Sequence, residues 1–398
     1  MRRFALHFAG LIVLGLLVLV ITEKTDLTIA ADAYTWERVP GIADGPVVFS
    51  LAASPDGRVV FAGTEGNGVF RSNGGNAFVP RNNGLPTDPI PRISALAVAP
   101  NFNNTTLALL GTNGSGVYRT TNGGETWIPV SDIPSDAAVY SLAFAPDGAS
   151  AFAAVGSATG SGIFLSRDGG STWHPASLQP VNHLIWQLAV SPKYATDHTV
   201  FAGGGTTTFI TTTKSLLWKS TDHSSQTTVA GGIFKSTDRG ETWNMVFDRG
   251  TNGVSALLMV GDAVYAGTPD GGVFRSTDGG ATWSPFENAG YHPTGIHSLA
   301  ATTQYGSDAA IFAGTWVSGV FRTLSNSPSW SPINSSFPHD DAGYAAVQAL
   351  VAVLGPDRIY AGTGGRAGAD GQGVWSTSMP LQTIRIYLPI TYKNTAGR

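Results

Sequence analysis

The sequence predicts an all-β protein, a single seven-bladed β-propeller of four-stranded antiparallel blades. One short phrase recurs seven times, and its copies are spaced by about 40 to 50 residues, the period of propeller blades. The composition agrees with this fold. Charged residues make up 13% of the 398 residues, about half of the roughly 25% that is usual, and the 50 glycines suit a chain with many tight turns.

The recurring phrase is a glycine, a hydrophobic residue and an aromatic residue in succession. In six copies a polar turn follows, and a second aromatic residue stands eight or nine positions after the first. The seventh copy has no such second aromatic residue. The triplets begin at Gly68, Gly116, Gly162, Gly232, Gly272, Gly319 and Gly373.

Two further short strands precede each phrase. The fifth unit shows all four strands, at residues 254–259, 263–267, 272–276 and 282–286. Four strands of about five residues joined by Gly, Asp and Asn turns form an antiparallel meander. Such a meander buries its faces only by stacking on its neighbours, which favours a closed ring. Beyond the N-terminal segment we expect no helix. The predicted first strands lie at 49–51, 93–98, 140–144, 186–190, 254–258, 296–299 and 347–351.

The ring must also be sealed where the chain begins and ends. Residues 35–40 match outer strands such as 126–130 and 329–333, and the last unit lacks an outer strand of its own. We therefore predict that the N-terminal strand completes the last blade and that Trp36 packs in it. Residues 383–390 are a competing candidate for the same place, because they also have a strand pattern.

The turn before each outer strand has a fixed chemistry, fullest in the sequence Ser-Thr-Asp-Gly-Gly-Ala-Thr-Trp at 276–283. A short carboxylate or amide at its third position can accept hydrogen bonds from the backbone N–H groups that follow. Four equivalent acids on four separate turns do not form one catalytic or metal site, so we interpret them as turn caps. The third positions are Asn122, Asp168, Asp238 and Asp278, and the final positions are Trp127, Trp173, Trp243 and Trp283.

These turns resemble the Asp-box, or BNR, repeats of sialidase-type propellers. The repeat pattern covers about residues 34–380, so the resemblance supports the fold strongly. It does not select a function, because such boxes occur in sialidases, xyloglucan hydrolases, sortilin-type receptors and photosystem II assembly factors. The resemblance implies that the boxes face away from the ligand site. Ligands would bind on the opposite face, at the second-to-third-strand loops and the connections between blades.

The N-terminus carries a targeting signal. Arg2 and Arg3 precede an apolar run at 4–21, which fits either a cleaved signal peptide or an uncleaved anchor. Both place the propeller outside the cytoplasm. The expected organisation is a signal region at 1–33, a propeller at 34–380, and a tail at 381–398 that serves in sorting or surface retention.

Composition excludes several classes of function. The chain has no cysteine, so it has no disulfide, thiol nucleophile or cysteine metal site. The net charge of −4 gives no electrostatic reason to bind nucleic acid. The loop histidines lack the spacing of metal ligands, and we expect no metal, no cofactor and a monomer.

A glycoside hydrolase would need two carboxylates at a defined separation on the loop face. The weak catalytic candidates there are Asp340, Asp341 and Glu65, and most other acids stand beside turn residues. The resemblance to sialidases stops short of their site, because the Phe/Tyr-Arg-Ile-Pro motif is absent. Catalysis is therefore the weaker hypothesis for the function of the loop face.

Binding is the favoured function of the loop face. The fourth unit carries an insertion at 206–231 that holds Trp218, and Tyr291, Trp316 and His339 stand in nearby connections. An aromatic surface of this kind suits a glycan or a protein, although the insertion alternatively packs on its own blade. We predict a non-catalytic extracytoplasmic recognition or assembly module. The alternative is an Asp-box glycoside hydrolase, xyloglucanase-like or a sialidase.

Overall fold

The computed structural model divides the chain into two units, Met1–Ala30 and Ala31–Arg398. It describes residues 34–42, 46–157, 160–177, 184–205, 231–250, 253–270, 272–287, 293, 295–302, 309–341, 343–353, 357–364 and 373–379. All of these residues fall in the second unit. Within them, no helix has the length and hydropathy that crossing a bilayer requires.

Seven four-stranded antiparallel sheets follow one another along the chain, as the sequence predicts. A two-stranded hairpin, β26 (His339–Asp340) and β27 (Gly343–Tyr344), lies between the sixth and seventh sheets in the chain. Blades 1 to 3 are β2 (Val48–Ala53), β3 (Val59–Thr64), β4 (Val69–Asn73), β5 (Val79–Pro80); β6 (Ile93–Val98), β7 (Ala108–Thr112), β8 (Val117–Thr120), β9 (Ile128–Pro129); and β10 (Ala138–Phe144), β11 (Ala151–Ser157), β12 (Gly160–Ser166), β13 (His174–Pro175).

The remaining four blades follow the same plan. Only the last of them takes a strand from the other end of the chain. Blades 4 to 7 are β14 (Leu184–Val190), β15 (Val200–Gly205), β16 (Gly231–Ser236), β17 (Asn244–Asp248); β18 (Ala256–Val260), β19 (Ala263–Thr268), β20 (Gly272–Ser276), β21 (Ser284–Pro285); β22 (Ile296–Ala301), β23 (Ala310–Thr315), β24 (Val320–Leu324), β25 (Ser327–Pro332); and β28 (Ala346–Val353), β29 (Arg358–Gly364), β30 (Gly373–Ser378), β1 (Glu37–Arg38).

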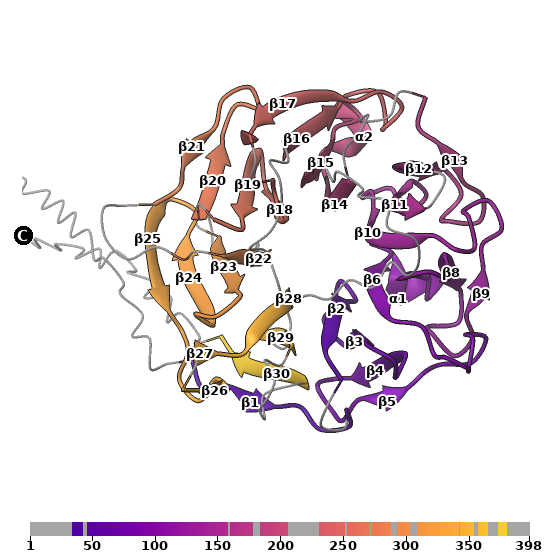
Figure 1. Ribbon diagram of the computed structural model, residues 1–398, viewed down its shortest axis with the longest axis horizontal. Coiled ribbons are helices and arrows are strands. Elements are labelled where there is room, and N and C mark those ends of the chain that lie inside the picture. Colours follow the sequence, from indigo (N-terminus) through magenta and orange to yellow (C-terminus); the bar gives the residue numbers. More distant parts are fainter. Residues whose placement is uncertain are drawn as a thin grey trace, which may run out of the picture. The chain divides into compact units, whose positions relative to one another are not determined.

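The first strand of each blade contacts the first strand of the next blade, and β28 contacts β2. The seven sheets therefore form a closed ring with the first strands innermost (Figure 1). This arrangement leaves no blade with an uncovered inner face. The predicted seven-bladed propeller is confirmed.

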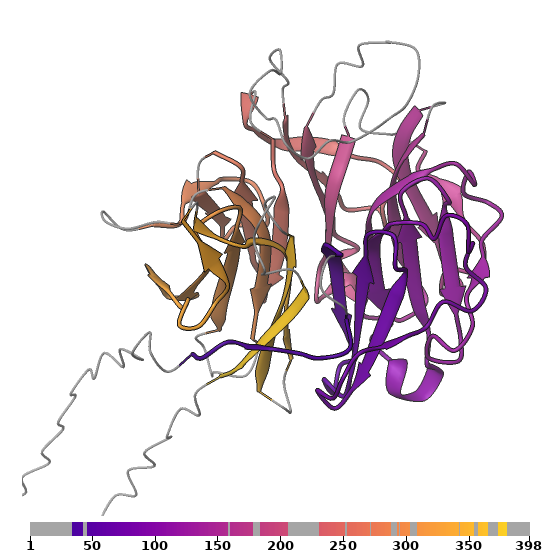
Figure 2. The same ribbon diagram turned by 60° about the horizontal axis from the view of Figure 1, so that its bottom comes forward.

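The ring is closed by the N-terminal strand. β1 pairs with β30, with Glu37 opposite Ser376 and Arg38 opposite Trp375, and Figure 2 shows β1 in indigo crossing the yellow β30. Trp36 is 2% exposed, and its indole Nε1 donates to the carbonyl of Ile333 at 2.6 Å. The predicted closure is confirmed, and the competing segment at 383–390 lies outside the described residues.

A repeated knob and hole joins adjacent blades next to the central axis. A buried β-branched residue at or next to the start of each first strand packs on the second strand of the preceding blade. The second strand presents glycine there in six blades and Ala154 in the other, because a Cβ at Gly267 would lie 2.3 Å from Ile296 Cγ2 and one at Gly314 would lie 2.4 Å from Val347 Cγ1. Protein interiors do not tolerate such overlap. The knobs are Val48, Ile93, Val139, Ile185, Val254, Ile296 and Val347.

Two details differ from the sequence predictions. We expected outer strands of about five residues, yet β5, β9, β13 and β21 each have two. Each ends on a proline, which has no N–H to continue a ladder. The chain also forms two single-turn helices where none was expected, α1 (Phe102–Thr105) and α2 (Tyr194–Asp197). They lie between the first and second strands of blades 2 and 4.

Candidate ligand-binding face at the channel mouth

The two ends of the blades carry different chemistry. The turns between third and fourth strands, which hold the Asp boxes, lie at one end, together with α1 and α2. The first strands begin at the other end, beside the loops that join second and third strands, because their first residues pair with the last residues of the second strands. We call these the box end and the mouth end. In Figure 2 the coil of α1 lies at the lower edge of the ring.

At the box end, each carboxylate is fully used within its own turn. Asp168 accepts hydrogen bonds from the Ser166 hydroxyl at 2.8 Å, from the Thr172 N–H at 2.9 Å and from the Thr172 hydroxyl at 2.7 Å. Asp238 and Asp278 repeat this network. Asn122 accepts from Thr120 and from the Thr126 N–H.

The electrostatics of the boxes follow from these hydrogen bonds. Partial burial raises the pKa of Asp168, but the hydrogen bonds from Thr172 and Ser166 outweigh it and leave the pKa below its ordinary value. Donation from the Thr282 and Ser276 hydroxyls and the Thr282 N–H likewise lowers the pKa of Asp278. These carboxylates stay ionised near neutral pH and cap turns, in agreement with the structural interpretation.

The boxes also connect neighbouring blades. The carbonyl of the first box glycine accepts a hydrogen bond from a cation on the third strand of the preceding blade. Arg71 Nη1 donates to Gly123 O at 2.7 Å, and Lys235 Nζ donates to Gly279 O at 2.7 Å. The indole N–H groups of Trp173, Trp243 and Trp283 each donate a hydrogen bond to a glycine carbonyl of their own box. The indole N–H of Trp127 instead donates to the Arg81 carbonyl of blade 1, at 2.9 Å.

At the mouth end, the first strands share a backbone irregularity. Six of them pair with their second strands through a register shift one residue after the buried knob. The extra residue is a β-bulge, which redirects its side chain. Ser255 holds the same position in blade 5, just before β18. All seven mouth residues are partly exposed: Phe49, Ser94, Tyr140, Trp186, Ser255, His297 and Gln348.

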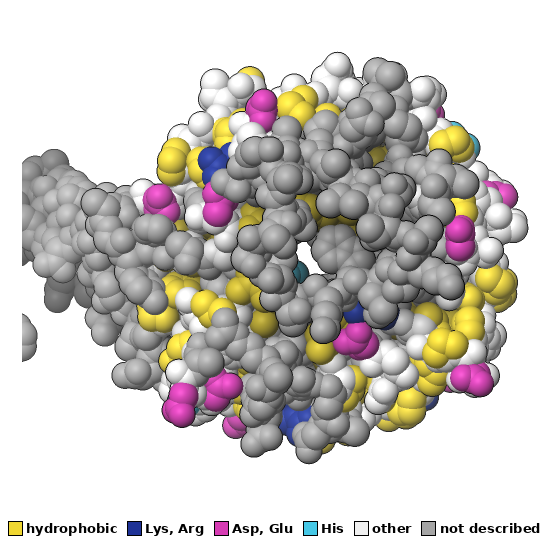
Figure 3. Space-filling model, in the orientation of Figure 1, with side chains coloured by type: hydrophobic (Ala, Val, Ile, Leu, Met, Phe, Trp, Pro, Cys, Tyr) yellow, Lys and Arg dark blue, Asp and Glu magenta, His cyan; other side chains and the backbone are white. Residues whose placement is uncertain are grey.

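Three of the mouth residues, Tyr140, Trp186 and Gln348, lie over glycine, and a Cβ at Gly364 would lie 2.8 Å from the Gln348 side-chain nitrogen. A Cβ at Gly205 would lie 2.8 Å from the Trp186 ring, one at Gly253 would lie 2.7 Å from it, and one at Gly156 would lie 2.8 Å from the Tyr140 ring. The absence of side chains beneath these rings lets them lie close to the backbone. The rings are therefore held at the inner edge of the propeller, whose open centre is visible in Figure 3.

Blades 1 and 6 have Glu65 and Trp316 in place of this glycine, and these side chains hold the mouth residues through other contacts. Glu65 forms an ion pair with Arg92 at 2.5 Å, and the Arg92 guanidinium lies 4.4 Å from the centre of the Phe49 ring. Trp316 packs edge-on against His297, with ring centres 4.4 Å apart. Burial raises the pKa of the Tyr140 hydroxyl, so it remains a neutral hydrogen-bonding group near pH 7.

The candidates from the sequence fall in three places. Glu65 and Trp316 follow β3 and β23 and lie beside mouth residues. His339 and Asp340 form the β26 strand, and the ring of His339 packs with Tyr344. Figure 1 places this hairpin at the outer edge of the ring, so Asp340 is not brought together with Glu65. Asp341 is exposed just after β26. Trp218 and Tyr291, with most of the 206–231 insertion, lie outside the described residues.

The sequence analysis did not single out the seven mouth residues as a set. A bulge leaves no direct signature in sequence, but its neighbours do. A β-branched residue stands one position before every mouth residue, and Ala-Gly-Thr recurs in second strands at 62–64, 266–268, 313–315 and 361–363. Aligning the units on these signals brings the mouth residues into one column. Among the described residues, no group of three His, Asp or Glu side chains is placed to hold a metal ion.

Comparisons with known proteins agree with this architecture. The BNR/Asp-box repeat model matches residues 274–285, and no curated protein sequence matches the chain. An ancestral GH74 enzyme is 18% identical with a TM-score of 0.61, covering 88% of this chain and 46% of its own. The Niastella koreensis GH74 enzyme is 15% identical with a TM-score of 0.56, covering 85% and 44%.

A third similar structure is the extracellular domain of the one-component system BT4673 from B. thetaiotaomicron. It is 15% identical with a TM-score of 0.57, covering 86% of this chain and 40% of its own. The chain thus spans less than half the length of each of these three proteins. It is a seven-bladed β-propeller with BNR/Asp-box repeats that resembles the propellers of GH74 enzymes and of BT4673.

Proposed function

We propose that the chain is an extracytoplasmic, non-catalytic recognition module that binds a glycan or protein ligand at the mouth end. One observation carries the proposal. The seven mouth residues supply aromatic, hydroxyl, imidazole and amide groups and no carboxylate. Apolar faces with a few convergent polar groups are the usual composition of a ligand site.

The same observation argues against hydrolysis. Retaining glycosidases hold two carboxyl groups about 5 Å apart and inverting ones about 6.5–9.5 Å apart. Glu65 lies beside the mouth residue Phe49 and is paired with Arg92. The described carboxyl groups whose pKa is shifted are all lowered, whereas a general acid needs a raised pKa.

Two features support the location and the ligand class. The basic and apolar N-terminal segment is typical of exported or membrane-tethered proteins, and one similar propeller belongs to an extracellular domain. Aromatic rings beside hydroxyl and amide groups suit the apolar faces and hydroxyls of sugar rings. A glycan is therefore the first ligand to test, with the protein acting as a monomer.

A glycan array followed by a hydrolysis screen on the same sugars tests the proposal. We expect binding without turnover, and we expect Trp186→Ala to weaken binding at least tenfold. Ile128→Ala is the control, because Ile128 is an exposed outer-strand residue at 62% exposure. Equal glycan affinity of the two variants would show that the ligand does not bind at the mouth end.

The alternative is a glycoside hydrolase of Asp-box type, for which the similarity to GH74 propellers is the supporting observation. Turnover of a xyloglucan or sialoside that is lost in Glu65→Gln, Asp340→Asn or Asp341→Asn would establish this alternative. It would also overturn the non-catalytic proposal.

A further inference from the structure

The seventh blade contains a divided Asp box. In blade 5, Arg275 pairs with Ser284, and Trp283 and Thr282 stand just before Ser284. In blade 7, Ser376 pairs with Glu37, and Trp36 and Thr35 stand just before Glu37. Thr35 therefore corresponds to Thr282. On the third strand, Thr377 corresponds to Ser276, because each lies opposite the equivalent residue of its second strand, Ile359 and Val264.

The divided box keeps the donors of a complete box but lacks its acceptor. In blade 5, Thr282 and Ser276 both donate to Asp278. The corresponding position in blade 7 is Met379, which is 4% exposed, and its N–H donates to the carbonyl of Asp357. The hydroxyls of Thr35 and Thr377 thus remain with no carboxylate between them.

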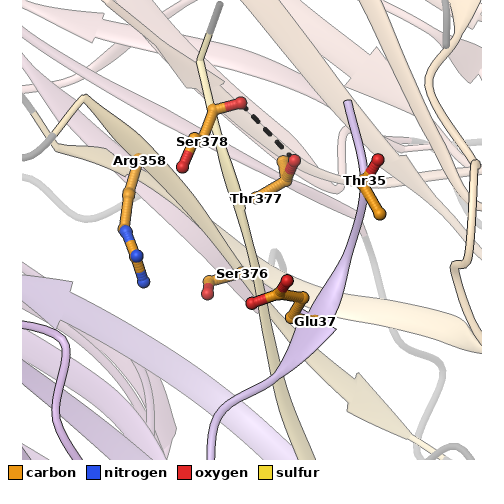
Figure 4. A pocket seen from close by; sticks show the side chains of 6 residues that line it. All are labelled: Thr35, Glu37, Arg358, Ser376, Thr377 and Ser378. Carbon is orange, nitrogen blue, oxygen red and sulfur yellow. Dashed lines mark hydrogen bonds between the residues drawn. The ribbon is translucent and has the colours of Figure 1, made fainter. Parts of the chain in front are cut away.

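A cavity of about 190 Å³ occupies this place, lined by Thr35, Glu37, Arg358, Ser376, Thr377 and Ser378. Figure 4 shows Thr35, which lies just before β1, and Thr377 on the neighbouring strand β30. Ser376 and Thr377, two of the residues that line the cavity, are 5% and 3% exposed. Thr377 has only a long bond of 3.5 Å, to the carbonyl of Ser378. A buried hydroxyl whose hydrogen bond is this long gains free energy when a ligand accepts a shorter one.

The charges at the rim decide the class of ligand. Arg358 lines the cavity and makes no ion pair with a described carboxylate, and it also lies beside the Tyr360 hydroxyl. Glu37 is exposed, and its repulsion of an anion is screened by water and salt. Hydroxyl donors with a guanidinium match the oxygens of a carboxylate.

We propose that this cavity binds a carboxylate from outside the chain, which takes the place of the missing box aspartate. The carboxylate is that of an acidic side chain of a bound peptide, and a free small carboxylate is the other source of the same chemistry. Such a ligand would bridge β1 and β30, the two strands that close the ring. The site lies at the box end, so it is separate from the mouth.

Calorimetric titration of the full chain tests the proposal with three probes. These are acetylated, amidated Ser-Thr-Asp-Gly-Gly, the same peptide with Asn in place of Asp, and sodium acetate. We expect the Asp peptide to bind at least tenfold more tightly than the Asn peptide and to raise the melting temperature. Equal affinity for both peptides, or no binding of either at millimolar concentration, would overturn the proposal. Binding of acetate as tight as that of the Asp peptide would assign the site to small free carboxylates.

Variants then identify the donors. We expect Thr377→Val and Arg358→Met each to weaken the Asp peptide about tenfold, the scale of one hydrogen bond to a charged group. Because Thr377 is buried, its variant is compared only if its melting temperature is retained. Glu37 is exposed, and Glu37→Gln should strengthen peptide binding because it removes a negative charge beside the cavity. Weaker binding by this variant would contradict the assignment of the cavity as a carboxylate site. Trp186→Ala should leave peptide affinity unchanged, so this test stands apart from the glycan test.

Discussion

The box end and the mouth end of the blades use repetition in opposite ways. At the box end the same side chains recur, and Asp168, Asp238 and Asp278 make the same hydrogen bonds in three blades. At the mouth end the backbone bulge recurs, while the residue that it presents changes from Phe49 to Ser94 to Trp186. The contrast teaches that a repeat can keep the same backbone conformation in every blade while the side chain at one position varies. Function is therefore expected where the side chains differ.

The largest effect on stability should come from the residue that closes the ring. Trp36→Ala should destabilise the protein by about 3–5 kcal/mol, because it empties a fully buried aromatic site and removes the bond to Ile333. Urea unfolding measures the loss. Trp283→Ala is the matched variant, since Trp283 has the same position in blade 5 but is only partly buried. If both variants lose the same free energy of unfolding, Trp36 contributes no more to stability in the closing blade than Trp283 does in blade 5.

A smaller effect should follow from filling a glycine hole near the mouth. Gly267→Ala places a Cβ 2.3 Å from Ile296 Cγ2, and overpacking of this kind costs about 1–3 kcal/mol. Ile296→Ala in the same chain should recover part of that cost, which a double-mutant cycle detects as coupling. If the two substitutions lower the free energy of unfolding additively, Ile296 does not pack on Gly267. The repeated packing of a β-branched residue on glycine would then be contradicted.

The smallest effect is pH-dependent and belongs to the box carboxylates. Since the folded pKa of Asp168 is lowered, its contribution to stability is present above the ordinary value of 3.8 and is lost as pH falls through the folded pKa. Asp168→Asn should therefore lower the melting temperature at pH 6, and the difference from wild type should shrink below about pH 4. The equivalent turn with Asn122 supplies no carboxylate, so Asn122→Ala should show a difference that does not change over this range.

The sequence predicted more of the frame than of the site. The triplets and the boxes located the blades, and Thr35-Trp36 identified the closing strand because it matches the other outer strands. Glu65 and Trp316 were predicted in second-to-third-strand loops and lie there, but their partners Arg92 and His297 were not paired with them. Those contacts join different strands or loops, so their distance along the chain gives no signal. The outer strands are shorter than predicted because proline, which has no N–H to donate, ends the hydrogen bonding of β5, β9, β13 and β21.

The sequence by itself determined the number of blades and the chemistry of each box turn, and it favoured the N-terminal strand over one competing segment for closing the ring. All three depend on residues near one another in the chain or on a pattern that repeats. Only the tertiary structure decided which side chains line the mouth and that Thr35 and Thr377 share a cavity. The first depends on bulges, which shift the register by one residue and so redirect a side chain. The second depends on bringing together two residues from opposite ends of the chain, which ring closure alone achieves.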